Sequence, residues 1–239
     1  MATLFVSDVH LSPARPAMHQ SFLAFLRDTA AHAAGLYILG DLFDYWAGDD
    51  ELDDEFNSGI ANALRALSTR GVPIHLLHGN RDFLLGAAFA AAADVKLISD
   101  PTLLRLHGVA TLVAHGDALC TKDLAYQAFR AKVRAPRWQS EFLAQPMSAR
   151  KATIDQLREE NDGEKLGKTE VIMDVTPDAV DALLRDHGYP RLIHGHTHRP
   201  ARHVHVVDGH RCERWVLGDW YRRGSYLRCD ESGCAAASL

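Results

Sequence analysis

The sequence has few cysteines and no long apolar run. Its four cysteines, at positions 120, 212, 229 and 234, form no C-x-x-C pair, which excludes a dense disulfide framework and fits a reducing compartment better than a secreted one. No apolar run reaches the roughly 18 residues of a membrane-spanning helix. The chain opens directly into a predicted strand, so we also expect no signal peptide.

An excess of positive charge is also missing. The formal net charge is −5, which argues against nucleic acid as the main partner. The 47% of hydrophobic and 24% of charged residues are ordinary for a globular protein. A length of 239 residues fits one large domain, or one domain that carries an insertion. We therefore expect a single domain over residues 1–239.

What the sequence does contain is a repeated pattern of short apolar runs that end in polar side chains. The central run, residues 36–39, is followed by Gly40 and Asp41. Such runs predict strands buried on both faces, and open α/β sheets bind ligands beyond the carboxyl ends of their strands. Five runs share this pattern, and the polar residues after them include Asp8, His10, Asp41, Asn80, His115, His196 and His198.

The side chains at these positions predict a metal site. They offer carboxylate, amide and imidazole donors without a thiolate, a mixture that suits Mn, Fe or Zn and is too rich in nitrogen for calcium. They are also more numerous than one ion needs. Two ions that share a bridging carboxylate would use them all, as in two-metal hydrolases.

The segment from residue 119 to about 170 departs from the alternation of strands and helices. We find no strand in it, and between residues 122 and 151 seven Lys and Arg stand against two acids. The sequence predicts a helical insertion at about residues 120–170 that lies over the metal site. Its aromatic residues fit a core equally well when taken alone. Together with the basic residues they favour an acyl-chain groove and a contact with an anionic membrane surface.

Three further expectations concern the flanking segments. The acidic patch at residues 49–55 is interpreted as the solvated start of a helix. Strands over 204–207, 214–217 and 225–229 should complete a second sheet. The tail from Glu231 should be loose.

The ordered motifs resemble those of the calcineurin-like metallophosphoesterases. The motifs are Asp8-x-His10, Gly40-Asp41, Gly79-Asn80, His115 and Gly195-His196-x-His198. The resemblance implies an αββα sandwich of two mixed sheets with flanking helices and a dinuclear metal centre. It also implies that Asp8, His10 and His198 hold one ion, that Asn80, His115 and His196 hold the second, and that Asp41 bridges them.

Five segments in and between these motifs are more specific, namely residues 40–46, 79–86, 126–130, 172–175 and 194–200. They are similar to one branch of that family, the pyrophosphatases that act on UDP-2,3-diacylglucosamine in lipid A biosynthesis. The resemblance implies that a metal-activated water, with Mn²⁺ as the metal, cleaves the diphosphate to UMP and 2,3-diacylglucosamine 1-phosphate (lipid X). It implies a peripheral enzyme on the cytoplasmic face of a bacterial inner membrane. The implied substrate contacts are Asn80, Arg81, Asp123, Asn161, Lys165, Lys168 and His196.

Arg81 is predicted to be catalytic, because a guanidinium can bind two phosphoryl oxygens at once. Many phosphomonoesterases of the family have a histidine here, which can protonate an alkoxide leaving group. A phosphate leaving group needs no such proton, so Arg81 favours a phosphoanhydride substrate. The alternatives are a phosphoprotein phosphatase, a dinucleoside polyphosphate hydrolase, or a non-enzymatic scaffold of the same fold. The first two usually carry Gly-Asp-x-Val-Asp-Arg-Gly where this chain has residues 40–46, and the complete ligand set argues against a scaffold.

Overall fold

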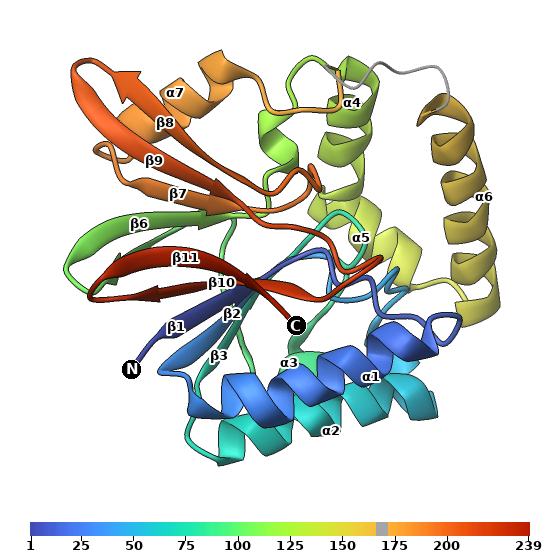
Figure 1. Ribbon diagram of the computed structural model, residues 1–239. Helices are drawn as coiled ribbons and strands as arrows, with labels where there is room; N and C mark the ends of the chain where they lie inside the picture. The colour runs from blue at the N-terminus through green and yellow to red at the C-terminus, as the bar shows by residue number, and fades with distance from the viewer. Residues whose placement is uncertain (166–171) are drawn as a thin grey trace.

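Two mixed β-sheets stack at the centre of the molecule, with helices outside them (Figure 1). The computed structural model describes residues 1–165 and 172–239, and the side chains of residues 1–157 and 172–239. The first sheet has the strand order β11-β10-β1-β2-β3-β4. Its strands are β1 (Thr3–Val6), β2 (Gly35–Leu39), β3 (Ile74–Leu77), β4 (Lys96–Leu97), β10 (Ser225–Asp230) and β11 (Gly233–Ser238).

The second sheet has the order β5-β6-β7-β9-β8, with β6, β7 and β9 parallel and an antiparallel strand at each edge. Its strands are β5 (Thr102–Leu106), β6 (Val109–Ala114), β7 (Arg191–His194), β8 (Ala201–Val207) and β9 (His210–Val216). The predicted fold class, an α/β sandwich of two mixed sheets, is therefore confirmed.

Helices cover the outer faces of both sheets and one end of the sandwich (Figure 1). The helices α1, α2 and α3 lie beneath the first sheet, and α7 lies over the second. The helices are α1 (Pro16–Ala24), α2 (Glu55–Thr69), α3 (Ala87–Ala93), α4 (Leu124–Val133), α5 (Pro136–Leu143), α6 (Met147–Lys165) and α7 (Pro177–Asp186). A π-helical turn over Phe25–Thr29 extends α1, and 3-10 turns lie at Ala30–His32, Asp49–Asp53 and Asp117–Leu119.

The core explains why the strand sequences are so apolar. In β2, Leu36 and Ile38 pack into the cluster under the helices, whereas Leu39 packs into a cluster between the two sheets with Phe5 and Ile193. All five are fully buried. Burying a side chain of this size contributes about 1.5–3 kcal/mol. Because β1, β2 and β3 are parallel neighbours, their carboxyl ends meet at one edge of the sheet.

The acidic patch is only in part the solvated helix start that we expected: Asp53, Asp54 and Glu55 are exposed at the start of α2, but two other residues of the patch have different roles. Asp54 does cap α2, since its carboxylate accepts from the backbone N–H groups of Phe56 and Asn57. Asp49, however, accepts from backbone N–H groups at the start of α3, and Glu51 is only 4% exposed. The unpaired N–H groups of a helix start attract carboxylates from distant segments as well as from the helix itself.

The C-terminal segment differs from the prediction in two ways. Strand β10 pairs antiparallel with β1 in the first sheet and does not join the second. The tail from Glu231 is not loose, because β11 pairs with β10 along its whole length. Gly233, at φ 116°, permits the tight connection between the two strands. Cys229 and Cys234 face each other across this pair and form a disulfide.

The helices α4, α5 and α6 lie together at the end of the sandwich toward which the parallel strands point (Figure 1). Asp123 caps α4 through the backbone N–H of Tyr126, and α5 begins with Pro136, whose missing N–H costs nothing at that position. Among the described residues, no helix is long and apolar enough to cross a membrane.

Candidate metal site and adjoining cavity

The predicted donors lie on tight turns at the strand ends. The turns after β1 and β2 pair with each other, since the backbone N–H groups of Asp8 and His10 bind the carbonyls of Gly40 and Asp41 at 3.1 and 2.9 Å. Several donors have a left-handed backbone, which costs a non-glycine residue of order 1–3 kcal/mol. They are Asp8 (φ 53°), His10 (φ 52°), Asp41 (φ 53°), His196 (φ 69°) and His198 (φ 54°). Strain gathered at one place is a mark of a functional site.

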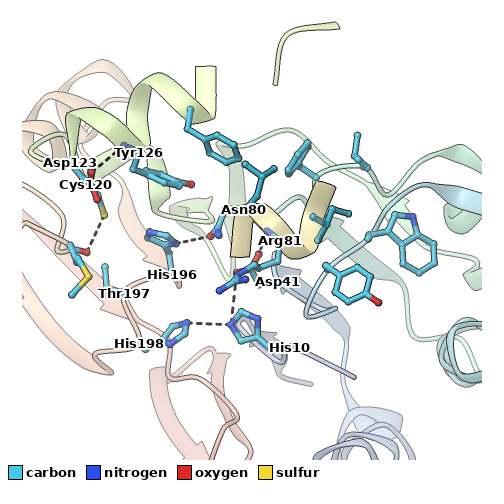
Figure 2. A pocket seen from close by; sticks show the side chains of 18 of the residues that line it. His10, Asp41, Asn80, Arg81, Cys120, Asp123, Tyr126, His196, Thr197 and His198 are labelled. Carbon is cyan, nitrogen blue, oxygen red and sulfur yellow. Dashed lines mark hydrogen bonds and ion pairs between the residues drawn. The ribbon is translucent and has the colours of Figure 1, made fainter. Parts of the chain in front are cut away.

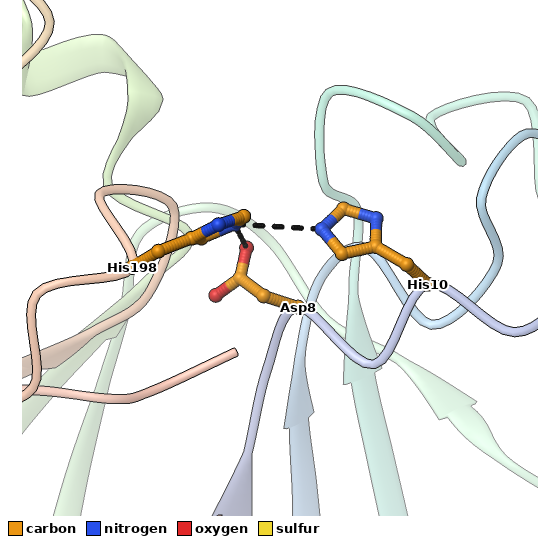
Figure 3. A group of neighbouring side chains, drawn as sticks. All are labelled: Asp8, His10 and His198. Carbon is orange, nitrogen blue, oxygen red and sulfur yellow. Dashed lines mark hydrogen bonds and ion pairs between the residues drawn. The ribbon is translucent and has the colours of Figure 1, made fainter. Parts of the chain in front are cut away.

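Asp8, His10 and His198 converge on one point (Figure 3). His198 Nε2 lies 3.3 Å from Asp8 Oδ1 and 3.4 Å from His10 Nε2. The other carboxylate oxygen, Asp8 Oδ2, accepts from Ser7 Oγ at 2.5 Å and from the backbone N–H of His196 at 2.9 Å. Asp8 Oδ1 is buried and has no hydrogen-bond partner among the described residues. A buried carboxylate oxygen held beside two imidazoles fits a metal ligand.

Asp41 stands between this group and a second one. Its Oδ2 lies 3.9 Å from His10 Nε2 and 3.8 Å from His115 Nε2, while Oδ1 accepts from the backbone N–H of Arg81 at 2.8 Å. One oxygen is thus held by the protein, and the other is nearly equidistant from the two histidines. Asp8, Asp41 and His115 form a second set of donors close enough to share an ion.

The electrostatics of this region favour bound cations. Burial, helped by the neighbouring carboxylates of Asp82 and Asp8, raises the pKa of Asp41 to about 7. Burial also lowers the pKa of His10 to about 3, which leaves a neutral ring able to bind a metal. At His115, burial is outweighed by the carboxylates around it, Asp41 foremost, and the pKa is about 9. Positive charge is therefore stabilised between these carboxylates.

Asn80, His115 and His196 also meet. The side-chain oxygen of Asn80 lies 2.9 Å from His115 Nε2 and 2.9 Å from His196 Nδ1, and Figure 2 shows the contact between Asn80 and His196 as a dashed line. The structure therefore brings all seven predicted donors to one place, from the first sheet on one side and the second sheet on the other.

Asp82 supports the site, although sequence reasoning missed it. It is fully buried, and its carboxylate accepts from the backbone N–H groups of Gly79 at 2.8 Å and Leu42 at 2.7 Å. It thus ties the turn after β2 to the turn after β3. The two turns approach so closely that a Cβ on Gly79 would lie 2.0 Å from Asp41 Oδ1.

Two further residues were missed that the sequence could have indicated. Leu217-Gly218-Asp219 repeats the pattern of the central run, an apolar strand followed by Gly-Asp. Asp219 lies 3.7 Å from His198 Nδ1, where it can orient the ring. Tyr221 stacks on the ring of His10, with ring centroids 5.1 Å apart.

A cavity of about 300 Å³ opens beside the metal donors (Figure 2). Its polar end contains Arg81 and Asp123, two of the predicted substrate contacts, together with Asn80 and His196. Asn161, Lys165 and Lys168 lie outside the residues whose side chains the structure describes. The rest of the cavity is mainly apolar and is lined by Trp46, Phe83, Leu84, Phe129, Trp138, Phe142, Ile154, Leu157 and Met173.

We had expected the basic residues of this segment to meet a ligand, but Arg130 of α4 and the adjoining Arg134 bind groups of the protein. Arg130 Nε binds the fully buried carboxylate of Asp117 at 2.8 Å, and Arg134 Nη2 donates to the carbonyl of Gly79 at 2.9 Å. Tyr126 Oη also donates to Asp117, at 2.7 Å. A buried carboxylate needs partners, so this charge fastens α4 to the turns that carry the donors.

Two basic residues of α6 also bind groups of the protein. Arg150 Nη1 donates to the carbonyl of Ala47 at 2.6 Å and to Asp50 at 2.9 Å, and Lys151 pairs with Glu51 at 3.0 Å. Arg150 and Lys151 thus bind α6 to the segment before α2. Contact of the insertion's basic residues with phosphate or lipid stays a prediction.

Comparisons with known proteins place this geometry in a family. A family model described as calcineurin-like phosphoesterase matches residues 1–200. The chain belongs to the calcineurin-like phosphoesterase family. This family uses a dinuclear metal centre, and the two donor groups of the structure are consistent with one.

The chain also resembles several curated members of this family over nearly its full length, each named UDP-2,3-diacylglucosamine hydrolase. The protein from Aromatoleum aromaticum is 51% identical over 98% of this chain and 95% of its own length. The protein from Xanthomonas campestris pv. campestris is 49% identical over 100% of this chain and 99% of its own. The protein from Cellvibrio japonicus is 49% identical over 98% of both chains.

Proposed function

We propose that this phosphoesterase hydrolyses the diphosphate bond of UDP-2,3-diacylglucosamine and releases UMP and 2,3-diacylglucosamine 1-phosphate (lipid X). The observation that carries this proposal is the sequence identity of 49–51% to proteins named UDP-2,3-diacylglucosamine hydrolase, across nearly their whole length. The cavity supports it independently, because metal donors and Arg81 stand at one end and apolar side chains at the other. A substrate with a diphosphate beside two acyl chains matches that division.

For the metals, we propose Mn²⁺ at two positions. Asp8, His10 and His198 would hold one ion, Asn80, His115 and His196 the other, and Asp41 both. The donor set suits a borderline metal of this kind. Two bound ions supply Lewis acidity to the phosphoryl oxygens and lower the pKa of a bound water.

The reaction itself exchanges one P–O bond for another. The oxygen of a water bonds to the α-phosphorus and the water gives up a proton to the solvent. The bond from that phosphorus to the bridging oxygen breaks, and its electron pair stays on the phosphate of lipid X. Arg81 is proposed as the catalytic cation, because its backbone is fixed to Asp41 at 2.8 Å and its side chain lines the cavity. Its guanidinium would bind two phosphoryl oxygens and stabilise their developing charge. The remaining proposed substrate contacts are Asn80, Asp123, Asn161, Lys165, Lys168 and His196.

We further propose that residues 1–239 form one domain with a specialised insertion at about 120–170. Phe129 of α4 and Trp138 and Phe142 of α5 line the apolar end of the cavity, which places the acyl chains between the insertion and the core. Leu124 and Leu143 of the same helices are 76% and 42% exposed. These exposed leucines support peripheral contact with a membrane, and we propose the anionic, cytoplasmic face of the inner membrane as that surface.

A product assay tests the proposal. With Mn²⁺, the protein should release UMP from UDP-2,3-diacylglucosamine at least a hundred times faster than it releases nitrophenol from p-nitrophenyl phosphate. A chelator should abolish the first activity and added Mn²⁺ should restore it. Faster turnover of the monoester, or UMP release that survives the chelator, would contradict the proposal.

A further inference from the structure

A second pocket, of about 270 Å³, lies against the loop that carries His196 and His198. Thr197 and Arg199 of this loop line both this pocket and the main cavity, so the two spaces are neighbours that share two side chains. The side chains that line it include the charged and hydrogen-bonding groups of Asp174, His203 and Arg214. We call it the polar pocket.

Arg214 gives the polar pocket a buried positive charge. Its side chain is only 8% exposed, and its Nε and Nη1 donate to His205 Nε2 at 3.1 Å and to His194 Nε2 at 3.0 Å. Because a guanidinium only donates, both rings must accept through Nε2 and carry their proton on Nδ1. The partners of the Nδ1 atoms agree with this tautomer, because both are acceptors. His194 Nδ1 lies 2.9 Å from the carbonyl of Gly195, and His205 Nδ1 lies 3.0 Å from the carboxylate of Asp181.

Neutral imidazoles position Arg214 but do not neutralise it. Among the described residues it has no ion-pair partner, and its Nη2 takes part in neither of these hydrogen bonds. Burial lowers the pKa of Arg214, and the nearby carboxylate of Asp174 offsets this only in part. A buried cation of this kind is usually completed by an anionic or polar ligand.

The other polar groups of the pocket add acceptors and donors. Asp174 pairs with Arg199 Nη1 at 2.9 Å, so a carboxylate and a guanidinium stand side by side. The hydroxyl of Thr197 is buried and has no hydrogen-bond partner in the described part of the chain. The pocket therefore offers both kinds of hydrogen-bonding group within a small volume.

We propose that the polar pocket binds the uridine half of the substrate, an inference that rests on the proposed function. The diphosphate at the metal donors joins a diacylated sugar to a nucleoside. The apolar part of the main cavity suits the acyl chains of the first, and the polar pocket shares Thr197 and Arg199 with that cavity. A uracil edge presents two carbonyl acceptors around one N–H donor, which guanidinium donors and the Asp174 carboxylate complement. The hydroxyls of the ribose can both donate and accept.

Product inhibition of the Mn²⁺-loaded enzyme tests this assignment, because the two products should occupy different spaces. In Asp174→Ala and His203→Ala variants, the inhibition constant of UMP and the KM of UDP-2,3-diacylglucosamine should rise at least tenfold. The inhibition constant of lipid X should stay within twofold of wild type. Wild type should also bind CMP at least fivefold more weakly than UMP, because cytosine lacks the N3–H donor, and Asp174→Ala should remove that preference.

Arg202→Ala is the matched control. Arg202 precedes His203 on β8, pairs with Glu213 and stacks over Trp215, away from the polar pocket, so its removal should change neither inhibition constant. Unchanged UMP inhibition in both pocket variants, or no UMP inhibition of a wild type that turns over its substrate, would overturn the inference. A wild type that does not hydrolyse UDP-2,3-diacylglucosamine would instead overturn the proposed function.

Discussion

At the scale of single residues, Asp41 is the donor that belongs to both metal groups. Its two oxygens have different tasks, since Oδ1 is fixed by the backbone of Arg81 and Oδ2 lies between His10 and His115. Asp41→Ala should therefore abolish activity and reduce metal content below one ion per chain, because both proposed positions lose a charged ligand. Metal analysis of the purified variant measures this. A variant that still holds two ions would show that Asp41 is not the bridge.

Arg81 is the residue that should set the reaction type. Arg81→His removes a bidentate cation and introduces a group that can protonate a leaving alkoxide. Turnover of UDP-2,3-diacylglucosamine should fall roughly 10²-fold, the usual cost of losing a charge-stabilising donor, while the rate on p-nitrophenyl phosphate should rise relative to wild type. Steady-state assays on both substrates measure the two rates. Unchanged turnover of UDP-2,3-diacylglucosamine would contradict the catalytic role of Arg81.

The sequence predicted the donors of the site better than the residues that support them. The donors follow apolar strands at a fixed position, and parallel strands bring those ends together. Asp82 was missed because its task is to bind backbone N–H groups, and nothing in the sequence says which N–H groups lie near it. Asp219 and Tyr221 were missed for a different reason, since they follow a segment that we had assigned only to completing a sheet, whereas β9 runs parallel to β7.

At the scale of elements, the insertion is fastened to the core by its charges. Arg130 is the closest cation to the fully buried Asp117, at 2.8 Å. Arg130→Ala should lower the free energy of unfolding by about 2 kcal/mol, less than a fully buried pair would lose, because Arg130 is 24% exposed and Arg134 remains 3.8 Å away. Chemical denaturation measures the loss.

Arg137→Ala is the control for this prediction. Arg137 also pairs with a carboxylate at 2.8 Å, that of Glu141, but its side chain is 90% exposed, so the change should cost less than about 0.5 kcal/mol. Equal losses in the two variants would show that the pairing with Asp117 does not stabilise the insertion.

The errors at the C-terminus concern features that strand pairing decides: β11 was expected to be loose, and β10 was assigned to the wrong sheet. The composition of β11, Gly-Cys-Ala-Ala-Ala-Ser, has little strand propensity, and only its ladder with β10 makes it a strand. Strand β10 itself pairs with β1, more than two hundred residues earlier in the chain. By contrast, the helix α2 was predictable, because Ile60, Leu64 and Leu67 repeat at helical spacing and are buried.

At the scale of the whole molecule, the candidate site exists only when the two sheets are stacked. Asp8, Asp41 and Asn80 follow strands of the first sheet, whereas His115 and His196 follow strands of the second. Metal binding should therefore be linked to folding. Adding Mn²⁺ at a hundred times its dissociation constant to chelator-treated protein should stabilise the fold by about 2.7 kcal/mol per site, and raise Tm by roughly 5 °C or more. A Tm that does not respond to Mn²⁺ would contradict a site shared by both sheets.

Substrate selectivity also belongs to the whole molecule, because the apolar cavity has walls from both the core and the insertion. Phe83 and Leu84 come from the turn after β3, and Phe129 and Trp138 from α4 and α5. Burying each CH₂ of an acyl chain should contribute about 0.8 kcal/mol, or close to fourfold in affinity. Substrates with progressively shorter chains should therefore show a KM that rises steeply while kcat changes little.

A single substitution tests better than a deletion whether the acyl chains bind between the insertion and the core. If a linker replaced the whole insertion, Asp117 and Glu51 would lose the cations that bind them. Phe129→Ala removes one wall of the cavity and keeps those contacts. It should raise the KM for the diacylated substrate about tenfold and flatten its dependence on chain length, because less apolar surface is then buried per CH₂. Kinetics on a series of chain lengths measures both effects. If the variant keeps the wild-type dependence, the acyl chains bind somewhere other than between the insertion and the core.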